Sequence, residues 1–257
     1  MLGLMLFVND ANSARSAVAY GLDHFLVDFE NHGKEARQLG YDTEIAPATL
    51  DDLRAVSAVE GGRAWCRIDR PGPGTAQQVE HAIDAGAQGI FLPMVESAGE
   101  VEAFLHQIDG RCAAGILIET LSGFESARDM AGLPIERVYF GLNDFAISRG
   151  GGSIFKALLD GSVERMREVF AGRKFGFGGV TAIDSGHPVP AKCLLQEMAR
   201  LNCDFSFLRR SFRRDIAQRD PRAVLADIHD YWRYCRNRDA ATAGRDRASL
   251  EAVLGGL

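Results

Sequence analysis

Two short apolar segments of the chain each end on a carboxylate. Residues 115–119 (GILIE) end at Glu119, and residues 138–144 (VYFGLND) end at Asp144. Their β-branched and aromatic residues are typical of buried parallel strands, which would bring both carboxylates to the carboxyl edge of one sheet. A divalent cation such as Mg²⁺ binds through one or two carboxylates and completes its shell with water and substrate oxygens. The pair therefore predicts a metal site, although either acid alone is also typical of a helix cap or a turn.

The elements that must position these carboxylates alternate regularly along the chain. Eight strands are predicted, at residues 3–8, 24–30, 63–69, 89–95, 113–119, 137–144, 174–180 and 204–211. Eight helices are predicted between and after them, at residues 12–20, 47–59, 75–85, 98–108, 122–130, 161–170, 190–201 and 221–236. This alternation predicts an α/β fold, a single (β/α)8 TIM barrel, as one catalytic domain over residues 1–236. The tail, residues 237–257, is predicted to form a C-terminal helical extension.

A doubly wound open sheet is the alternative fold for such an alternation. That fold would be favoured by a glycine-rich phosphate loop directly after the first strand. The chain has residues 9–12 (NDAN) at this place, without a glycine. The barrel is therefore the favoured architecture.

The composition is that of a soluble globular protein with a large core. The 257 residues are 46% hydrophobic and 25% charged, and the formal net charge is -6. This acidic balance argues against nucleic acid and against an anionic membrane surface as partners. The apolar stretch at residues 2–8 is too short for a membrane span and lacks the basic flank of a signal peptide, so it is interpreted as a strand. The five cysteines include no Cys-x-x-Cys pair, which fits a reduced cytoplasm.

In a (β/α)8 barrel, side chains at the carboxyl ends of the strands converge on one mouth, where the active site lies. The predicted strands place these further polar residues there: Asn9, Asp10, Asp28, Glu30, Arg67, Asp69, Glu96, Asn143, Thr181 and residues 209–211 (RRS). Several carboxylates around one cavity repel one another strongly unless a cation or an arginine compensates them. A metal at Glu119 and Asp144, with Arg67 opposite, meets that need.

Five strand-end motifs together resemble the HpcH/HpaI aldolase and citrate lyase β-subunit family, whose members are barrels of the phosphoenolpyruvate/pyruvate type. In chain order they are DFE (28–30), AWCR (64–67), GAQGIFLPMV (86–95), IETLSG (118–123) and FGLNDFA (140–146). The resemblance extends over residues 2–150. It implies that Glu119 and Asp144 bind Mg²⁺, Mn²⁺ or another divalent metal. It also implies that Arg67 binds the keto and carboxylate oxygens of the substrate, and that Asp28 and Glu30 organise waters and the surroundings of the metal.

Two positions depart from the family pattern. The hydroxy-oxo-acid aldolases have a histidine directly after the glutamate of the second strand, at or near the catalytic base, whereas this chain has Asn31 there and His32 next to it. The catalytic base is then His32, a metal-held water oriented by Asp28 and Glu30, or a group from a neighbouring subunit, and the water is favoured. Leu117 replaces a glutamine of those aldolases and matches the apolar residue of the CoA-using relatives.

The implied bond cleavage beside a keto acid needs a sink for the enolate, which is either a lysine Schiff base or a metal. No lysine lies at the mouth end of a predicted strand, which favours the metal. On the eighth strand, Arg209 and Arg210 are predicted to point to opposite faces, so that only one of them reaches the mouth. We assign Arg209 to a distal carboxylate or phosphate of the substrate, the alternative being a solvated basic stretch. Asn143 and Thr181 are assigned to substrate binding as well.

The leading hypothesis is a metal-dependent carbon–carbon lyase of the class II aldolase type, which acts on 2-oxo acids through a pyruvate-like enolate. One alternative is a citrate- or malyl-CoA-lyase-like enzyme that uses an acyl thioester. The other is a catalytically silent barrel that serves in binding or assembly, because the usual histidine is missing at Asn31. The expected partners are the small-molecule substrate and further copies of the chain in a homo-oligomer, without nucleic acid or membrane.

Overall fold

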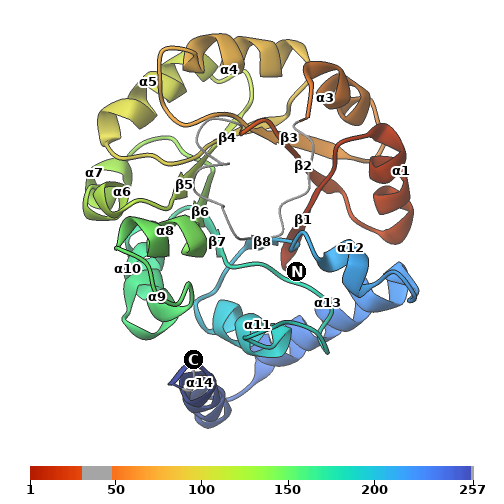
Figure 1. Cartoon of the computed structure of the whole chain (residues 1–257), viewed down its shortest axis with the longest axis vertical. Coiled ribbons are helices and arrows are strands. Elements are labelled where there is room, and N and C mark those ends of the chain that lie inside the picture. Colours follow the sequence, from red (N-terminus) through yellow and green to blue (C-terminus); the bar gives the residue numbers. More distant parts are fainter. Residues whose placement is uncertain (31–47, 256–257) are drawn as a thin grey trace.

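The computed structural model of the chain describes residues 1–30 and 48–255. Within these ranges, eight parallel strands form the centre of the molecule (Figure 1). They are β1 (Gly3–Phe7), β2 (His24–Asp28), β3 (Arg63–Arg67), β4 (Gly89–Leu92), β5 (Ala113–Ile118), β6 (Arg137–Phe140), β7 (Lys174–Phe177) and β8 (Phe205–Phe207), in the hydrogen-bonded order β7-β6-β5-β4-β3-β2-β1-β8. Backbone hydrogen bonds from Val180 to Phe207 and from Asp204 to Phe175 join β8 to β7. The strands therefore close into a ring, and the predicted (β/α)8 barrel is confirmed.

Helices cover the outside of the strand ring (Figure 1). Ahead of the last two they are α1 (Ala11–Tyr20), α3 (Leu50–Ser57), α4 (Thr75–Asp84), α5 (Ala98–Ile108), α6 (Leu121–Glu125), α7 (Ala127–Met130), α8 (Leu142–Ser148), α9 (Lys156–Leu159), α10 (Ser162–Val169), α11 (Ala191–Arg200) and α12 (Phe212–Asp215). Local capping fixes where several of them begin. Asp10 caps α1, while Thr49 and Ser97 form capping boxes with Asp52 and Glu100. None of the described helices is long and apolar enough to cross a membrane.

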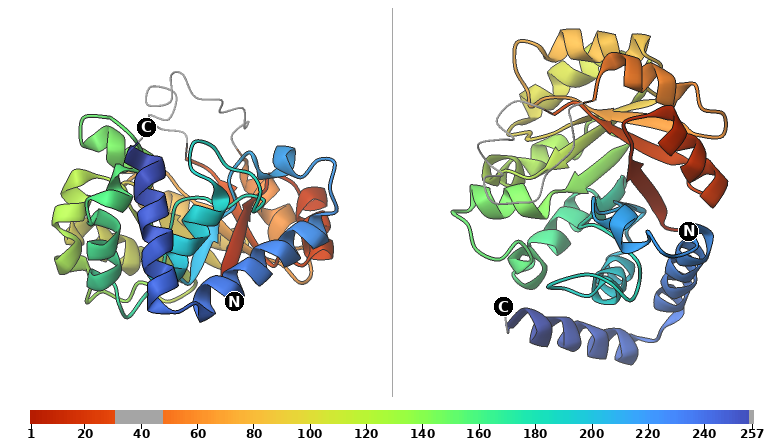
Figure 2. Two further views of the ribbon diagram at one scale, coloured as in Figure 1. Left: turned by 90° about the horizontal axis from the view of Figure 1, so that it is seen from below. Right: turned by 45° about the vertical axis from the view of Figure 1, so that its right-hand side comes forward.

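The described chain ends in two longer helices, α13 (Pro221–Asn237) and α14 (Ala240–Gly255). α14 lies on the outside of the barrel and packs against α11 (Figure 2). It buries Leu250 and Leu254, and its Arg247 forms an ion pair with the buried Glu197 of α11, with Nη1 and Oε1 2.5 Å apart. The tail is thus a helix that is fixed to its own barrel by both apolar and charged contacts.

Large side chains fill the interior of the barrel. The buried cluster inside the strand ring consists of Met5, Leu26, Trp65, Phe91, Leu117, Tyr139, Phe205 and Phe207. Glycines on the neighbouring strands make room for two of the rings. A Cβ atom at Gly89 would lie 2.4 Å from the ring of Trp65, and one at Gly115 would lie 2.4 Å from the ring of Phe91. The strand ring is therefore a packed core and not a pore.

Replacing Gly89 with alanine is expected to lower the free energy of unfolding by about 1–3 kcal/mol, because the new methyl group overpacks the barrel interior against Trp65. Urea denaturation measures the effect. Gly99→Ala is the matched control, since a Cβ atom at this exposed position in α5 meets nothing within 4 Å. An unfolding midpoint of Gly89→Ala equal to that of the control would show that the interior has spare volume.

Candidate active site

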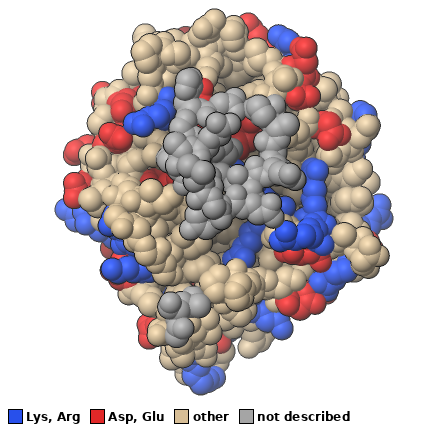
Figure 3. All heavy atoms as spheres, viewed as in Figure 1, with Lys and Arg blue, Asp and Glu red and all other residues tan. Residues whose placement is uncertain are grey.

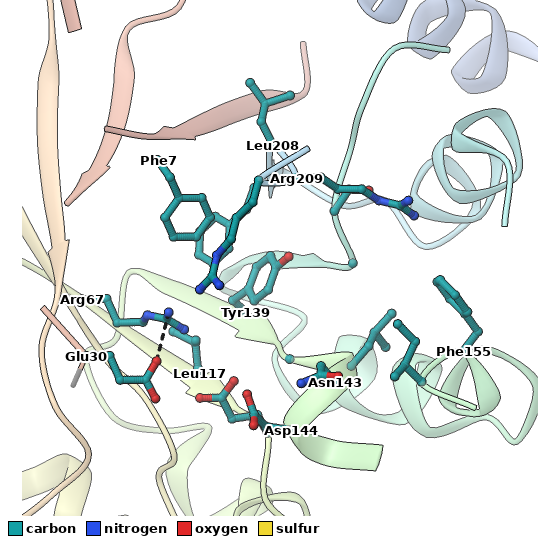
Figure 4. Close-up of a pocket in the computed structure, with 18 of the residues that line it drawn as sticks. Phe7, Glu30, Arg67, Leu117, Tyr139, Asn143, Asp144, Phe155, Leu208 and Arg209 are labelled. Carbon is teal, nitrogen blue, oxygen red and sulfur yellow. Dashed lines mark hydrogen bonds and ion pairs between the residues drawn. The ribbon is translucent and has the colours of Figure 1, made fainter. Parts of the chain in front are cut away.

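A cavity of about 470 Å³ opens at the carboxyl ends of the strands, where a barrel holds its active site (Figure 4). Its described walls come from the ends of seven strands and from the segments that follow β6 and β7. The polar side chains in these walls are Glu30, Arg67, Glu119, Asn143, Asp144, His187, Arg209 and Arg210. The fold thus brings both expected metal ligands and Arg67 to one place.

Glu119 follows β5 directly and is buried, with 3% of its surface exposed. The backbone N–H of Met94 donates a hydrogen bond to its Oε1 at 3.0 Å. Gly141 leaves room for the carboxylate, because a Cβ atom there would lie 2.3 Å from Oε2. Burial raises the pKa of the Glu119 carboxyl, and the neighbouring Asp144 and Glu30 raise it further. Glu119 is therefore a fixed and crowded carboxylate whose negative charge a cation would stabilise.

Asn143 and Asp144 lie in the first turn of α8, whereas the sequence predicts a strand that continues to Asp144. β6 ends before Gly141, whose carbonyl oxygen accepts the first helical hydrogen bond, from the N–H of Phe145. The strand prediction is wrong here because a short apolar run fits a buried strand and a buried helix equally well. Both polar side chains nevertheless line the cavity (Figure 4), and the electrostatic coupling of Asp144 with Glu119 is strong enough to raise the pKa of Glu119.

Arg67 is held by two carboxylates at the end of β2. Its Nε and Nη2 donate to Oδ1 and Oδ2 of Asp28 at 3.0 and 2.8 Å, and Nη2 lies 2.9 Å from Oε2 of Glu30 (Figure 4). Burial acts to lower the pKa of Arg67, but the two carboxylates outweigh it and raise the pKa. Arg67 and Glu30 line the cavity, whereas the buried Asp28 is not part of the described wall. Asp28 therefore acts by orienting Arg67, and Glu30 is the acid of the pair that faces the cavity.

Arg209 and Arg210 both line the cavity, so the prediction that only one of them reaches the mouth is wrong. β8 has only 3 residues, and residues beyond the strand do not follow its alternation. Nε of Arg209 donates to the carbonyl oxygen of Gly179 at 3.0 Å, and its guanidinium points away from the acidic side chains (Figure 4). Nη2 of Arg210 lies 3.7 Å from Oδ2 of Asp28. The two arginines therefore face different parts of the cavity.

The structure does not bring Thr181 to the described wall of the cavity. Its side chain is fully buried, and its hydroxyl donates to Oδ2 of Asp215 in α12 at 2.6 Å. Thr181 therefore links the segment after β7 to α12, because its hydroxyl is committed inside the protein. Glu96 also lies away from the cavity wall and forms an exposed ion pair with Arg70, with Oε1 and Nη2 3.4 Å apart.

Two predicted positions, Asn31 and His32, lie outside the described residues. The structure also places His187 and Pro188 in the cavity wall; they belong to residues 176–188, a segment that is expected to influence substrate choice. No strand end or family motif marks these two residues in the sequence, since they follow the barrel strand by several positions.

The face on which the cavity opens is asymmetric in charge. Basic side chains gather on the side where α12 lies in Figure 1 (Figure 3). This short helix carries Arg213 and Arg214. Nη2 of Arg213 donates to the carbonyl oxygen of Phe7 at 3.2 Å, while the rest of the side chain is exposed. The acidic groups at the cavity thus have a basic rim on one side.

Glu119 and Asp144 form the pair of carboxylates that fits a metal. Within residues 1–30 and 48–255, no three His, Cys, Asp or Glu side chains form a metal-ligand set. A cation at this place would therefore take two carboxylates from the described chain, which suits Mg²⁺ or Mn²⁺, with water and substrate oxygens in its other positions. The crowding of Glu119 by Asp144 and Glu30 fits this assignment, because a divalent cation would offset the repulsion.

The amino-acid sequence matches one protein family and two named aldolases. The family model described as HpcH/HpaI aldolase/citrate lyase matches residues 2–177. The 4-hydroxy-2-oxovalerate aldolase of Rhodococcus jostii (strain RHA1) is 24% identical over 206 residues, which cover 67% of this chain and 74% of that protein. The 2-keto-3-deoxy-L-rhamnonate aldolase of Shigella dysenteriae serotype 1 (strain Sd197) is 23% identical over 214 residues, which cover 68% and 73%.

Two solved structures share the fold at low sequence identity. The citrate synthase SbnG superposes with a TM-score of 0.62 at 16% identity, over 91% of this chain and 94% of that one. An HpcH/HpaI aldolase/citrate lyase family protein from Burkholderia cenocepacia J2315 superposes with a TM-score of 0.61 at 14% identity, over the same shares of the two chains. These superpositions show that the whole barrel, and not only the matched part of the sequence, has the architecture of these proteins.

Proposed function

Because the chain belongs to the HpcH/HpaI aldolase/citrate lyase family, we propose that it is a divalent-metal-dependent carbon–carbon lyase. It makes or breaks a bond at the methyl carbon of a pyruvate-like unit in a 2-oxo acid. The observation that carries this proposal is that Glu119, Asp144 and Arg67 meet in one cavity at the carboxyl end of the barrel. Two curated relatives are named aldolases, which supports the reaction class. The metal, when bound, supplies Lewis-acid stabilisation of the enolate.

The residues of the chain divide the remaining work. Glu119 and Asp144 hold the cation, and Arg67 donates to the keto and carboxylate oxygens of the substrate with the N–H groups that Asp28 and Glu30 leave over. The two carboxylates keep the guanidinium from rotating, so it is already oriented when the substrate arrives. Arg67 therefore loses little conformational entropy when it binds the substrate, because the folded protein already holds its side chain in place.

The walls of the cavity define where the reacting carbon can lie. Apolar contacts come from Leu117, Tyr139 and Phe207, which exclude water from one side of the bound enolate. The amide of Asn143 offers a further hydrogen bond to the substrate, and Arg209 lines the opposite part of the cavity, where it binds a distal anionic group. These residues favour a small, polar 2-oxo acid with its reacting end at the acidic side.

Exchange of the methyl protons of pyruvate with deuterium from D₂O tests the function, because it requires enolate formation but no aldehyde. We expect exchange in the presence of Mg²⁺ or Mn²⁺ and the loss of exchange after treatment with EDTA. Proton NMR measures the exchange as the decrease of the methyl signal. A protein that binds the metal but exchanges no protons of pyruvate would be a silent barrel. Exchange only at the methyl group of an acyl thioester would favour the CoA-dependent alternative.

The same assay identifies the proton acceptor. We expect Glu30→Gln to slow exchange by about 10²- to 10⁴-fold, because Glu30 faces the cavity and positions the water that removes the proton. His32→Ala should leave the exchange rate close to that of the wild type. If His32→Ala stops exchange while metal binding is intact, the imidazole is the base and the assignment to a Glu30-positioned water is wrong.

A further inference from the structure

The hydrogen-bonding capacity of Arg67 is largely used by the protein itself. Nε and Nη2 both donate to Asp28, and Nη2 also pairs with Glu30 at 2.9 Å. Nη1 of Arg67 donates no hydrogen bond to the described residues. Arg67 therefore offers a substrate less than the full bidentate fork of a guanidinium, and its charge is already shared by two acids.

Among the described residues, Arg210 is a second arginine at the acidic side of the cavity, beside Arg67. Its side chain is 28% exposed, and Nη2 lies 3.7 Å from Oδ2 of Asp28, which is an ion pair but not a hydrogen bond. No N–H group of Arg210 donates to any residue in the described part of the chain. Its guanidinium carbon lies 6.0 Å from the ring centroid of Phe7, another residue of the cavity wall.

The charges around the cavity show what Arg210 adds. The carboxylates of Asp28 and Glu30 lie within ion-pair distance of Arg67, and that of Asp28 also lies within ion-pair distance of Arg210. Burial lowers the pKa of Arg210, while Asp28, Glu30 and Asp144 act to raise it. Arg210 therefore interacts electrostatically with the acids that hold Arg67 and with one of the expected metal ligands. Arg210 therefore adds positive charge on the side of the cavity where these acids lie, which favours the entry of an anionic 2-oxo acid.

We propose that Arg210 is a substrate-binding residue that holds the carboxylate of the 2-oxo acid together with Arg67. This rests on the proposed metal-dependent function and adds a second cation to its substrate site. Arg209 does not fill this role, because its Nε is bound to Gly179 and its guanidinium points away from the acidic side chains (Figure 4).

The test measures two affinities whose expected changes have opposite signs. Mn²⁺ binding is measured by electron paramagnetic resonance, and binding of oxalate to the Mn²⁺-loaded protein by calorimetry. In Arg210→Gln we expect Mn²⁺ to bind at least as tightly as in the wild type, because a nearby positive charge is removed. Oxalate should bind about 10- to 100-fold more weakly, because charge-assisted hydrogen bonds are lost. Arg210→Lys should recover part of the oxalate affinity.

Arg213→Gln is the control for net charge. Arg213 is exposed on α12, and the substitution removes the same charge from the same rim without a contact to the acids. We expect its oxalate affinity to stay within about 3-fold of the wild type. Three results would each overturn the assignment. They are an equal loss of oxalate affinity in Arg210→Gln and Arg213→Gln, an unchanged oxalate affinity in Arg210→Gln, and a loss of both Mn²⁺ and oxalate binding in Arg210→Gln. A wild-type protein that binds no Mn²⁺ would refute the metal-dependent function itself, and Arg210's role with it.

Discussion

Glutamine in place of Glu119 is expected to abolish Mg²⁺ and Mn²⁺ binding and, with it, the exchange of pyruvate methyl protons. The substitution keeps the size of the side chain and an oxygen for the Met94 N–H, so the local fold should persist. It removes one of two anionic ligands, and the lost Lewis-acid stabilisation amounts to several kcal/mol of barrier, or a rate loss of about 10³-fold or more. Asp144→Asn should behave in the same way.

A stability measurement separates this loss from misfolding. Without metal, Glu119→Gln should be at least as stable as the wild type, because a buried charge beside Asp144 and Glu30 has been removed. Glu96→Gln is the matched control, since it removes an exposed carboxylate near the end of a neighbouring strand. Full activity of Glu119→Gln in metal-free buffer would show that Glu119 and Asp144 do not form the proposed metal site.

Lysine in place of Arg67 is expected to lower kcat/KM by at least ~10²-fold, which corresponds to roughly 2.7 kcal/mol of transition-state stabilisation. Lysine keeps the charge, but one ammonium group cannot reproduce the fork that binds Asp28 and Glu30 while also reaching the substrate. The loss should appear in the affinity for oxalate as well, because the contact is made before the reaction.

Arg111→Lys controls for the chemistry of the substitution. Arg111 also binds a carboxylate with two nitrogens, since Nη1 and Nη2 donate to Glu80 at 2.8 and 2.5 Å, but this pair lies on the surface. Its replacement should leave kcat/KM unchanged. Kinetics of Arg67→Lys that match this control would mean that Arg67 has a structural role only.

The sequence predicts where each strand begins better than where it ends. All eight observed strands start within one residue of the predicted position, but all eight end earlier than predicted. The cause is visible after β4 and β8, where Val95 and Leu208 lie beyond the strand and are still fully buried. Apolar residues continue past the carboxyl ends because the segments that follow the strands are buried too: Val95 belongs to the hydrophobic core, and Leu208 lines the cavity. Hydrophobic patterning reports burial, and it cannot tell a strand from the buried loop that follows it.

The same limit explains which site residues the sequence places and which it does not. Glu119 and Arg67 are fixed by strands with a clear pattern, so their convergence follows from the barrel alone. The different roles of Asp28 and Glu30 could not be predicted from the sequence. They depend on side-chain geometry: Asp28 binds Arg67 with both carboxylate oxygens, and Glu30 lines the cavity. Arg210 could not be separated from Arg209, because both follow a strand whose end the sequence does not mark.

The glycines inside the barrel have a consequence for how this chain can diverge from its relatives. Gly89 leaves the space that the ring of Trp65 fills, and Gly115 does the same for Phe91. A larger residue at either glycine therefore requires a smaller one at its aromatic partner, and the two effects on stability are not additive. Such positions should covary among homologues as complementary large and small pairs. Coupled exchange of this kind lets these two pairs change while the volume of the barrel interior stays the same.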